Sequence, residues 1–522
     1  MTLLTFSGEE GSTADIYLSI KPGNGAIYID SFPLSQLDTQ GSTRFANQIA
    51  CNFLQENCAR WDFFYTIRSG SSIVGGPSAG AAIAVLTTAV LDNLDIDDTV
   101  AMTGTINSGG LIGPVGGISH KVASAKKNGI TKVLIPLLNQ RYDNETNITL
   151  NRGIVEEISD GILVVKIGTL EEALLEITGK DYRRTYEAIS EPSAYKARMR
   201  VITDALCDRN GELREAVSEQ GLSYNDSNNY TTRIQQATHE YSRASLCFSS
   251  NAELSSMLAT ALTEDERAER KTLLADELAQ AKYDLATHDI TTTNDLQIMA
   301  IVLERIHEAE QLLEDPTPAQ LGFAEERLQS ITQWTAFFGM PGPRIVVDEA
   351  HLEEVCLAMR LEAEERVNYV GFYSETLVLT AQDVLEQSYN EEPLLCILLA
   401  AKAKAQANIL ASTLFVDNAV VDTLIQEKIA ANTVIVQQQI ARGIFPVLGH
   451  SYTRYAADLA AAAPYSALTF AEYALEFSHT DLYFPEKKRF TFPPMSREFA
   501  IVFLLGSMFG AAVALLVTYR RS

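Results

Sequence analysis

The sequence predicts an α+β protein with an N-terminal α/β domain, a mainly α-helical region and one C-terminal transmembrane helix. β-rich and helical segments alternate over residues 1–180, whereas long amphipathic segments rich in Ala, Leu and Glu dominate residues 181–480. Residues 498–519 then form an almost uninterrupted apolar run. A chain of 522 residues is also longer than one ordinary hydrophobic core needs, so several domains are expected.

The N-terminal domain, residues 1–180, is expected to alternate strands with helices. Runs of β-branched and aromatic residues are separated there by turn signals and by segments with helical spacing. In chain order we expect strands at 14–20 and 25–30, a helix at 42–58, a strand at 61–69, a helix from Ser78, a strand at 99–106, a helix from about Ser119, strands at 132–136 and 161–168, and a helix at 169–179.

The helical region is expected to form two domains, residues 181–345 and 346–480. Segments such as 265–288 have the apolar spacing of amphipathic helices, and breaks fall at Asp315–Pro316 and over 339–344. We find no fixed-period repeat, although helix pairs of tetratricopeptide length remain an alternative. The sequence offers no catalytic constellation in this region.

Residues 498–519 are the expected transmembrane helix, and residues 481–497 form the juxtamembrane linker before it. About 21 helical residues extend about 31 Å, which matches the hydrocarbon thickness of a bilayer. Basic residues lie on both sides of the span, so the positive-inside rule leaves its orientation open. The first residues contain no apolar run long enough for a signal peptide, which leaves a cytoplasmic body or an export segment absent from this sequence.

The charge of the chain excludes a nucleic-acid partner. The net charge is −26 and the pI is about 4.7, and the basic residues never gather into a long run that would attract phosphate locally. Neither a metal nor a cofactor site is expected. The chain has no CxxC pair and no GxxxxGK phosphate loop, and His239, His288 and His307 lack HExxH spacing.

The six cysteines allow disulfides if the protein folds in an oxidising compartment. Two pairs are each separated by about the span of a helical hairpin: Cys207 with Cys247, and Cys356 with Cys396. Burial as small apolar side chains is the alternative for either pair. Cys51 and Cys58 fall in one expected helix, where seven positions along the axis would keep them apart. Sequons at Asn144, Asn147, Asn225 and Asn229 suit an exported body.

The stretch GGPSAGAAIAVL, residues 75–86, places one hydroxyl, Ser78, between glycines at the start of an apolar helix. A hydroxyl attacks a carbonyl only if a base removes its proton and donors stabilise the oxyanion. Gly76 and Gly80 leave the backbone open to a peptide, and Pro77 suits a helix start, where free amides can receive negative charge. The alternative is a serine that only caps the helix.

Lys121, within GGISHKVASAKK at residues 116–127, is the expected base. Its neighbours on the same helical face, Ile118 and Ala125, are apolar, and desolvation lowers the pKa of an amine. A fall of about three units from about 10.4, equivalent to about 4 kcal/mol, is needed for a base near neutrality. His120 is the alternative base, but it faces away from the Lys121 side of the helix.

Three segments in this order resemble the proteolytic domain of Lon-type serine proteases. They are GGPSAG around Ser78, AMTGT around Thr103 and GGISHK around Lys121, and the first and last of these residues are 43 positions apart, as in that family. The resemblance covers roughly residues 14–175. It implies that Ser78 is the nucleophile, Lys121 the base and Thr103 a residue that orients the lysine. The supporting motif residues are Gly76, Pro77, Ala79 and Gly80.

This sequence departs from the family pattern at two positions. Gly75 and Thr105 stand where many Lon enzymes carry acidic residues. The phosphate loop of an ATPase is also missing, and in this respect the chain is similar to membrane-anchored archaeal Lon-like proteases without an AAA+ module. That resemblance implies an ATP-independent endopeptidase that hydrolyses unfolded or extended polypeptides. It also implies a body outside the cytoplasm, a C-terminal helix in the lipid of the cell membrane, and assembly into a homo-oligomer.

Two other functions are open to the sequence. In the first, the chain is a non-catalytic membrane-anchored scaffold whose acidic helical region binds partner proteins. In the second, it is a self-processing peptidase with one dedicated cleavage site. The intact pair of Ser78 and Lys121 argues against the scaffold, because a relic would often lose one of two replaceable residues.

Overall fold

The fold is taken from a computed structural model, which describes residues 1–7, 10–32, 35, 37–69, 77–139, 155–158, 162–183, 188–414 and 416–478. The linker expected at 481–497 and the transmembrane helix expected at 498–519 lie outside the described residues. Gly75 and Gly76 lie outside them too, as do the sequons at Asn144 and Asn147.

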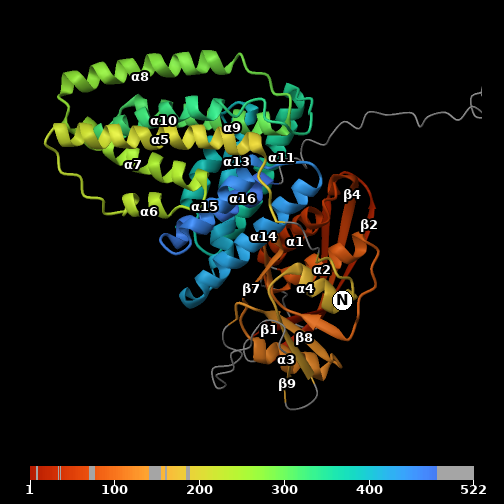
Figure 1. Ribbon diagram of the computed structural model, residues 1–522. Coiled ribbons are helices and arrows are strands. Elements are labelled where there is room, and N and C mark those ends of the chain that lie inside the picture. Colours follow the sequence, from red (N-terminus) through yellow and green to blue (C-terminus); the bar gives the residue numbers. More distant parts are fainter. Residues whose placement is uncertain are drawn as a thin grey trace, which may run out of the picture. The chain divides into compact units, whose positions relative to one another are not determined.

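The N-terminal part of the chain contains all the strands of the described residues (Figure 1). Its elements are β1 (Thr2–Ser7), β2 (Glu10–Pro22), β3 (Ile27–Phe32), α1 (Leu37–Leu54), η1 (Cys58–Arg60), β4 (Trp61–Ser69), η2 (Pro77–Ala79), α2 (Gly80–Leu91), β5 (Val100–Met102), β6 (Thr105–Asn107), η3 (Ser108–Gly110), β7 (Leu111–Gly113), α3 (Ile118–Lys127), β8 (Lys132–Pro136), β9 (Val155–Ile158), β10 (Ile162–Ile167) and α4 (Leu170–Thr178). The predicted mixture of strands and helices is thereby confirmed.

One mixed sheet organises this domain, with the strand order β3-β4-β2-β1-β5-β8-β10-β9. Strands β1, β5, β8 and β10 are parallel neighbours, and their side chains alternate between two apolar layers. In β8, Leu134 packs toward the layer of α1, α2 and α4, whereas Val133 and Ile135 pack toward α3. The sheet therefore separates the helix that carries Lys121 from the helix that follows Ser78.

The segment 99–106, expected as one strand, forms two strands in two different sheets. It breaks at Thr103–Gly104 because the backbone there changes hydrogen-bond partner. The Thr103 amide still donates to Leu134 of β8, at 3.1 Å, but the Gly104 amide donates to the carbonyl of Ser78, at 3.0 Å. Strand β6 then pairs with β7 as a small hairpin. This break brings the end of β5 to the turn that carries Ser78.

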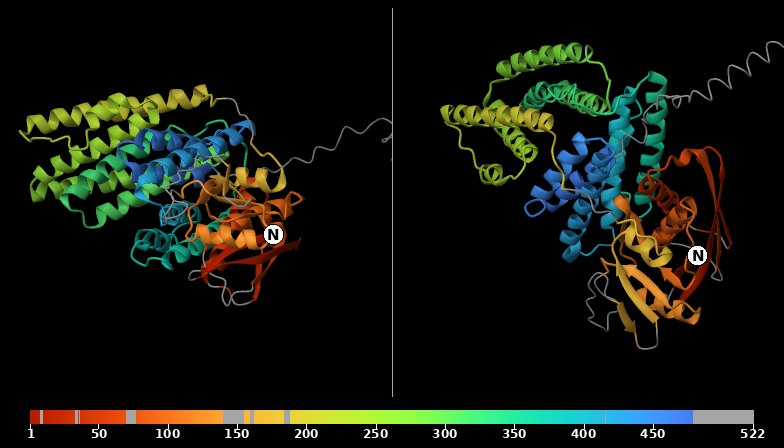
Figure 2. Two further views of the ribbon diagram at one scale, coloured as in Figure 1. Left: turned by 90° about the horizontal axis from the view of Figure 1, so that it is seen from below. Right: turned by 45° about the vertical axis from the view of Figure 1, so that its right-hand side comes forward.

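The rest of the described chain is helical (Figure 2). Its elements are α5 (Ser193–Glu219), α6 (Tyr230–Gln236), α7 (Glu240–Ala261), α8 (Glu264–Leu285), α9 (Thr293–Glu314), α10 (Pro318–Thr335), α11 (Glu349–Gly371), α12 (Leu379–Gln387), α13 (Pro393–Thr413), η4 (Asn418–Val420), α14 (Val421–Ala441), α15 (Val447–Leu459) and α16 (Pro464–Ser478). The expected breaks are confirmed. Helix α9 ends before Asp315–Pro316, and residues 339–344 lie between α10 and α11.

A single hydrophobic cluster runs through both halves of this helical region, from Tyr195 on α5 to Phe477 on α16. The division near residue 345 therefore stays a prediction from the sequence. Within the described residues, one helix, α13, has the length and apolar composition of a membrane span, with a mean hydropathy of 1.5. However, 72% of its most apolar window is buried among other helices, so we interpret it as a core helix.

All six cysteines form disulfides, and one of them corrects the sequence analysis. The two hairpin pairs, Cys207–Cys247 and Cys356–Cys396, join α5 to α7 and α11 to α13. Cys51 and Cys58, which we expected to be too far apart on one helix, are also bonded. The reason is that α1 ends at Leu54 and the backbone reverses at Gln55, whose φ is +55°, so Cys58 returns to the side of Cys51.

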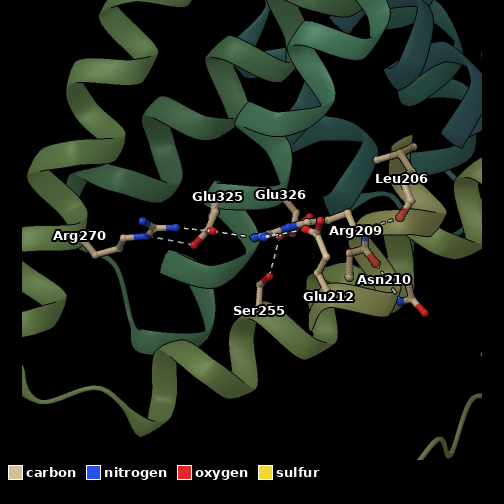
Figure 3. Close-up of polar contacts among 9 residues, drawn as sticks. Leu206, Arg209, Asn210, Glu212, Ser255, Arg270, Glu325 and Glu326 are labelled. Atoms are coloured by element: carbon tan, nitrogen blue, oxygen red, sulfur yellow. Dashed lines mark hydrogen bonds and ion pairs between the residues drawn. The ribbon is translucent and has the colours of Figure 1, made fainter. Parts of the chain in front are cut away.

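A cluster of charged residues joins four helices of the helical region (Figure 3). Arg209 on α5 donates to Glu325 and Glu326 on α10, at 2.8 and 3.1 Å, and Arg270 on α8 pairs with Glu325. Ser255 on α7 donates to the fully buried Glu326, at 2.6 Å. Burial raises the pKa of Glu326, although Ser255 and Arg209 act in the opposite direction. We interpret this cluster as a structural link between the helices.

Candidate active site

Ser78 lies in the short turn η2, immediately before the buried helix α2. Helix α2 is capped by Ala79 without any side-chain hydrogen bond, so the hydroxyl of Ser78 is not the helix cap. Pro77 and Ala79 share the turn with Ser78, and Gly80 begins the helix. A Cβ atom at Gly80 would lie 3.1 Å from the Ile106 side chain and 3.2 Å from its backbone nitrogen, so the glycine permits close packing against β6.

Lys121 lies on the inner face of α3, with a side chain that is only 3% exposed. Ile118 and Ala125, the neighbours predicted from helical spacing, are buried beside it, whereas His120 is exposed. Burial lowers the pKa of Lys121 from 10.5 to about 8. The amine is therefore partly neutral in mildly alkaline solution, as a general base requires.

Thr103 connects the lysine to the turn of Ser78. The Lys121 amine donates to the Thr103 hydroxyl, at 3.0 Å, and this hydroxyl donates to the carbonyl of Ser78, at 3.4 Å. The Gly104 amide donates to the same carbonyl, at 3.0 Å, and the Gly104 carbonyl accepts from Ala81, at 3.0 Å. The carboxyl end of β5, the first turn of α2 and the lysine of α3 therefore converge at Thr103, which is fully buried.

The hydrogen bonds of the Lys121 amine determine whether it can accept a proton. Among the described residues, no hydrogen bond joins the Lys121 amine directly to the Ser78 hydroxyl. A neutral amine has two N–H donors and one lone pair, so donation to Thr103 leaves the lone pair available to accept a proton. Catalytic hydrogen bonds are often long in the free enzyme and shorten when substrate binds. When neutral, the Lys121 amine can therefore accept a proton.

Sequence reasoning identified Ser78, Lys121 and Thr103 but missed Gly104. The signal for Gly104 was present in the MTGT segment, because a glycine inside a strand pattern marks a break or a close backbone approach. A Cβ atom at Gly104 would lie 2.5 Å from the Ile112 side chain, so no larger residue fits this position without rearrangement. Of the motif residues, Gly75 and Gly76 lie outside the described residues.

A cavity of about 280 Å³ lies between this domain and the helical region. Its lining comes from α1, η3 and α4 together with α13, α14 and α16, and it does not include Ser78 or Lys121. Residues 70–76, which precede Pro77 and Ser78, lie outside the described residues. Within the described residues, no group of three or more His, Cys, Asp or Glu side chains is arranged to hold a metal ion.

Comparison with known proteins identifies the class of this domain. Residues 48–176 match the family of the Lon protease (S16) C-terminal proteolytic domain, the serine endopeptidase domain of Lon proteases. The matched segment contains Ser78, Thr103 and Lys121. The N-terminal part of the chain therefore carries a proteolytic domain of the Lon type, as the three motifs indicated.

The chain is similar to Lon protease 2 of Bacillus subtilis (strain 168), with 39% identity over 108 residues, which covers 21% of this chain and 17% of that protein. It is 31% identical over 134 residues to the Lon protease of Clostridium beijerinckii, covering 26% of this chain and 16% of the relative. The Lon protease of Methanosarcina barkeri is 32% identical over 133 residues, which cover 26% of this chain and 16% of that protein. In all three, the match spans about a sixth of the relative and about a quarter of this chain.

Proposed function

We propose that this protein is a serine endopeptidase in which Ser78 is the nucleophile and Lys121 the general base. The observation that carries the proposal is the buried lysine with a lowered pKa that is tied, through Thr103, to the turn of Ser78. Lys121 accepts the proton of the Ser78 hydroxyl while its oxygen attacks the substrate carbonyl. The leaving amine takes that proton from Lys121, and water then releases the acyl group from Ser78.

We further propose that this activity needs no nucleotide and is directed at unfolded or extended polypeptides. Support comes from the sequence, which has no phosphate loop of the GxxxxGK type. A Lon-type domain without ATP-driven unfolding can reach only segments that are already extended. The helical region lies outside residues 48–176, the segment that matches the Lon proteolytic domain.

The location that we propose is the outer side of a cell membrane, with a single anchor at residues 498–519. The apolar run in the sequence supports the anchor. The pairing of all six cysteines supports an oxidising compartment, because cytosolic proteins rarely keep structural disulfides. Exposed sequon residues at Asn225 and Asn229 agree with an exported body.

The test uses the full-length chain in detergent micelles, with casein as an unstructured substrate and without nucleotide. We expect cleavage by the wild type and none by Ser78→Ala or Lys121→Arg, since arginine does not deprotonate at usable pH. Lys127→Arg, an exposed change on the same helix, is the matched control and should retain full activity. Cleavage by Ser78→Ala would refute the nucleophile.

Two further outcomes separate the alternatives. In the first, the wild-type chain cleaves no substrate and Ser78 does not react with a fluorophosphonate, but the chain binds partner proteins. This result would favour the scaffold. A wild-type chain that cleaves only itself, at one site identified by mass spectrometry, would favour the self-processing peptidase.

A further inference from the structure

Three buried side chains form a hydrogen-bonded cluster where the catalytic domain meets the helical region. Ser108, the first residue of η3, donates to the carboxylate of Glu472 on α16, with oxygen–oxygen distances of 2.8 and 2.7 Å. Lys428 on α14 pairs with the same carboxylate and donates to the Ser108 hydroxyl, at 3.2 Å. Both charged side chains are completely buried, so Ser108 is hydrogen-bonded to an ion pair that only the helical region supplies.

Such an ion pair is unusual because both charges lose their hydration. A buried pair is favourable only when its remaining hydrogen-bonding groups are satisfied, and Ser108 satisfies one on each partner. The backbone next to it is equally constrained. Gly109 has a φ of +74°, and a Cβ atom there would lie 3.3 Å from both Ala431 on α14 and Leu475 on α16. This geometry fixes the tip of the β6–β7 hairpin against two helices.

The other end of the same hairpin is part of the candidate active site. Ile106 of β6 lies against Gly80, two residues after Ser78. Gly104, which directly precedes β6, donates to the Ser78 carbonyl, and Ile112 of β7 packs on Gly104. A movement of the hairpin would therefore displace the Ser78 turn and the threonine that binds Lys121.

We propose that Lys428 and Glu472 are positioning residues for the active site. Through Ser108, they hold the hairpin in the place where it fixes the Ser78 turn and Thr103, the hydrogen-bond partner of Lys121. Neither side chain touches the reacting atoms, and the inference rests on the proposed function. The helical region then supports the geometry of the active site directly.

The test compares three variants of the full-length chain in micelles. Ser108→Ala removes only the hydroxyl and is the mildest change, and Lys428→Met removes the buried cation. Lys402→Met is the matched control, because Lys402 on α13 pairs with Glu304 on α9 and both residues belong to the helical region. For each we measure kcat and KM for a peptide substrate, the pH dependence of kcat, the rate of fluorophosphonate labelling of Ser78, and thermal unfolding.

We expect kcat to fall about tenfold or more in Ser108→Ala and Lys428→Met, with KM within about twofold of the wild type. The rise of kcat with pH should shift to more alkaline pH in both, because displacement of Thr103 would let water reach the buried Lys121 amine beside it. Ser78 labelling should slow in parallel. Lys402→Met should change thermal unfolding without moving the pH profile.

The proposal is overturned if the wild type is active and Ser108→Ala and Lys428→Met keep its kcat and pH profile. It is also overturned if all three variants lose activity only in proportion to the loss of folded protein. A wild type that neither cleaves peptide nor takes up label at Ser78 would instead refute the proposed function itself.

Discussion

Replacement of Lys121 by methionine should abolish activity and, at the same time, stabilise the fold at neutral pH. The two side chains have similar length, but methionine carries no charge into the core. Burial lowers the pKa of Lys121 from 10.5 in the unfolded chain to about 8 in the folded one. At 1.36 kcal/mol per unit, this shift corresponds to a cost of about 3 kcal/mol for the buried cation. The lost hydrogen bond to Thr103 offsets about 1 kcal/mol of the gain, so the net expected stabilisation at pH 7 is about 2 kcal/mol.

The lowered pKa of Lys121 also determines how the free energy of unfolding changes with pH. Below pH 8 the lysine is protonated in both states, and the full cost is present. Between pH 8 and 10.5 the unfolded chain binds more protons than the folded one, so the wild type gains stability as the pH rises. Above 10.5 both states are neutral and the cost disappears. The advantage of Lys121→Met should therefore be largest at pH 7 and shrink through this window.

The assay is chemical unfolding at pH 7, 8, 9 and 10, with the disulfides intact and fluorescence as the probe. Lys127→Met is the control, because Lys127 is exposed on the same helix and should change the free energy of unfolding little. The reasoning is refuted if Lys121→Met is less stable than the wild type at pH 7, or if both chains show the same slope with pH.

Three other predictions concern the site and the disulfides. The rate of peptide hydrolysis should rise with pH with an apparent pKa of about 8, the value of Lys121, and a profile flat from pH 6 to 9 would exclude this lysine as the base. Thr103→Val keeps the shape of the side chain but removes the hydroxyl, so kcat should fall about tenfold while KM changes little, and a change in KM alone would contradict its role. Cys207→Ser with Cys247→Ser should lower the free energy of unfolding by about 4 kcal/mol, measured by denaturant titration. An unchanged midpoint would show that this disulfide does not form.

Local patterns in the sequence were sufficient to predict much of the N-terminal domain. Helical spacing around Lys121 predicted that Ile118 and Ala125 would surround the amine, and both are buried. The strand at 61–69 and the helix at 169–179 were predicted from apolar periodicity almost to their observed ends. Such features depend on neighbours within one element, which is information that a single sequence contains.

Features that depend on distant partners were missed. The break at Thr103–Gly104 reflects a hydrogen bond to Ser78, which lies 26 positions before Gly104. The Cys51–Cys58 disulfide requires α1 to end at Leu54. The residues that follow, such as Gln55 and Asn57, did not mark this helix end in the sequence. The contacts of Ser108 were not predicted, because its charged partners follow more than 300 positions later in the sequence. These contacts are set by tertiary packing, which periodicity and motif spacing do not encode.

The packing around Lys121 links the stability of the fold to its proposed chemistry. Because burial is the cause of the lowered pKa, any change that lets water reach the amine raises that pKa. At pH 7, a pKa of about 8 leaves about one amine in ten neutral, whereas a pKa of about 9 leaves about one in a hundred. A loss of enclosure too small to unfold the domain therefore reduces the active fraction tenfold. The same enclosure destabilises the protonated state of Lys121 by about 3 kcal/mol at pH 7, a cost that favourable packing elsewhere in the fold must offset.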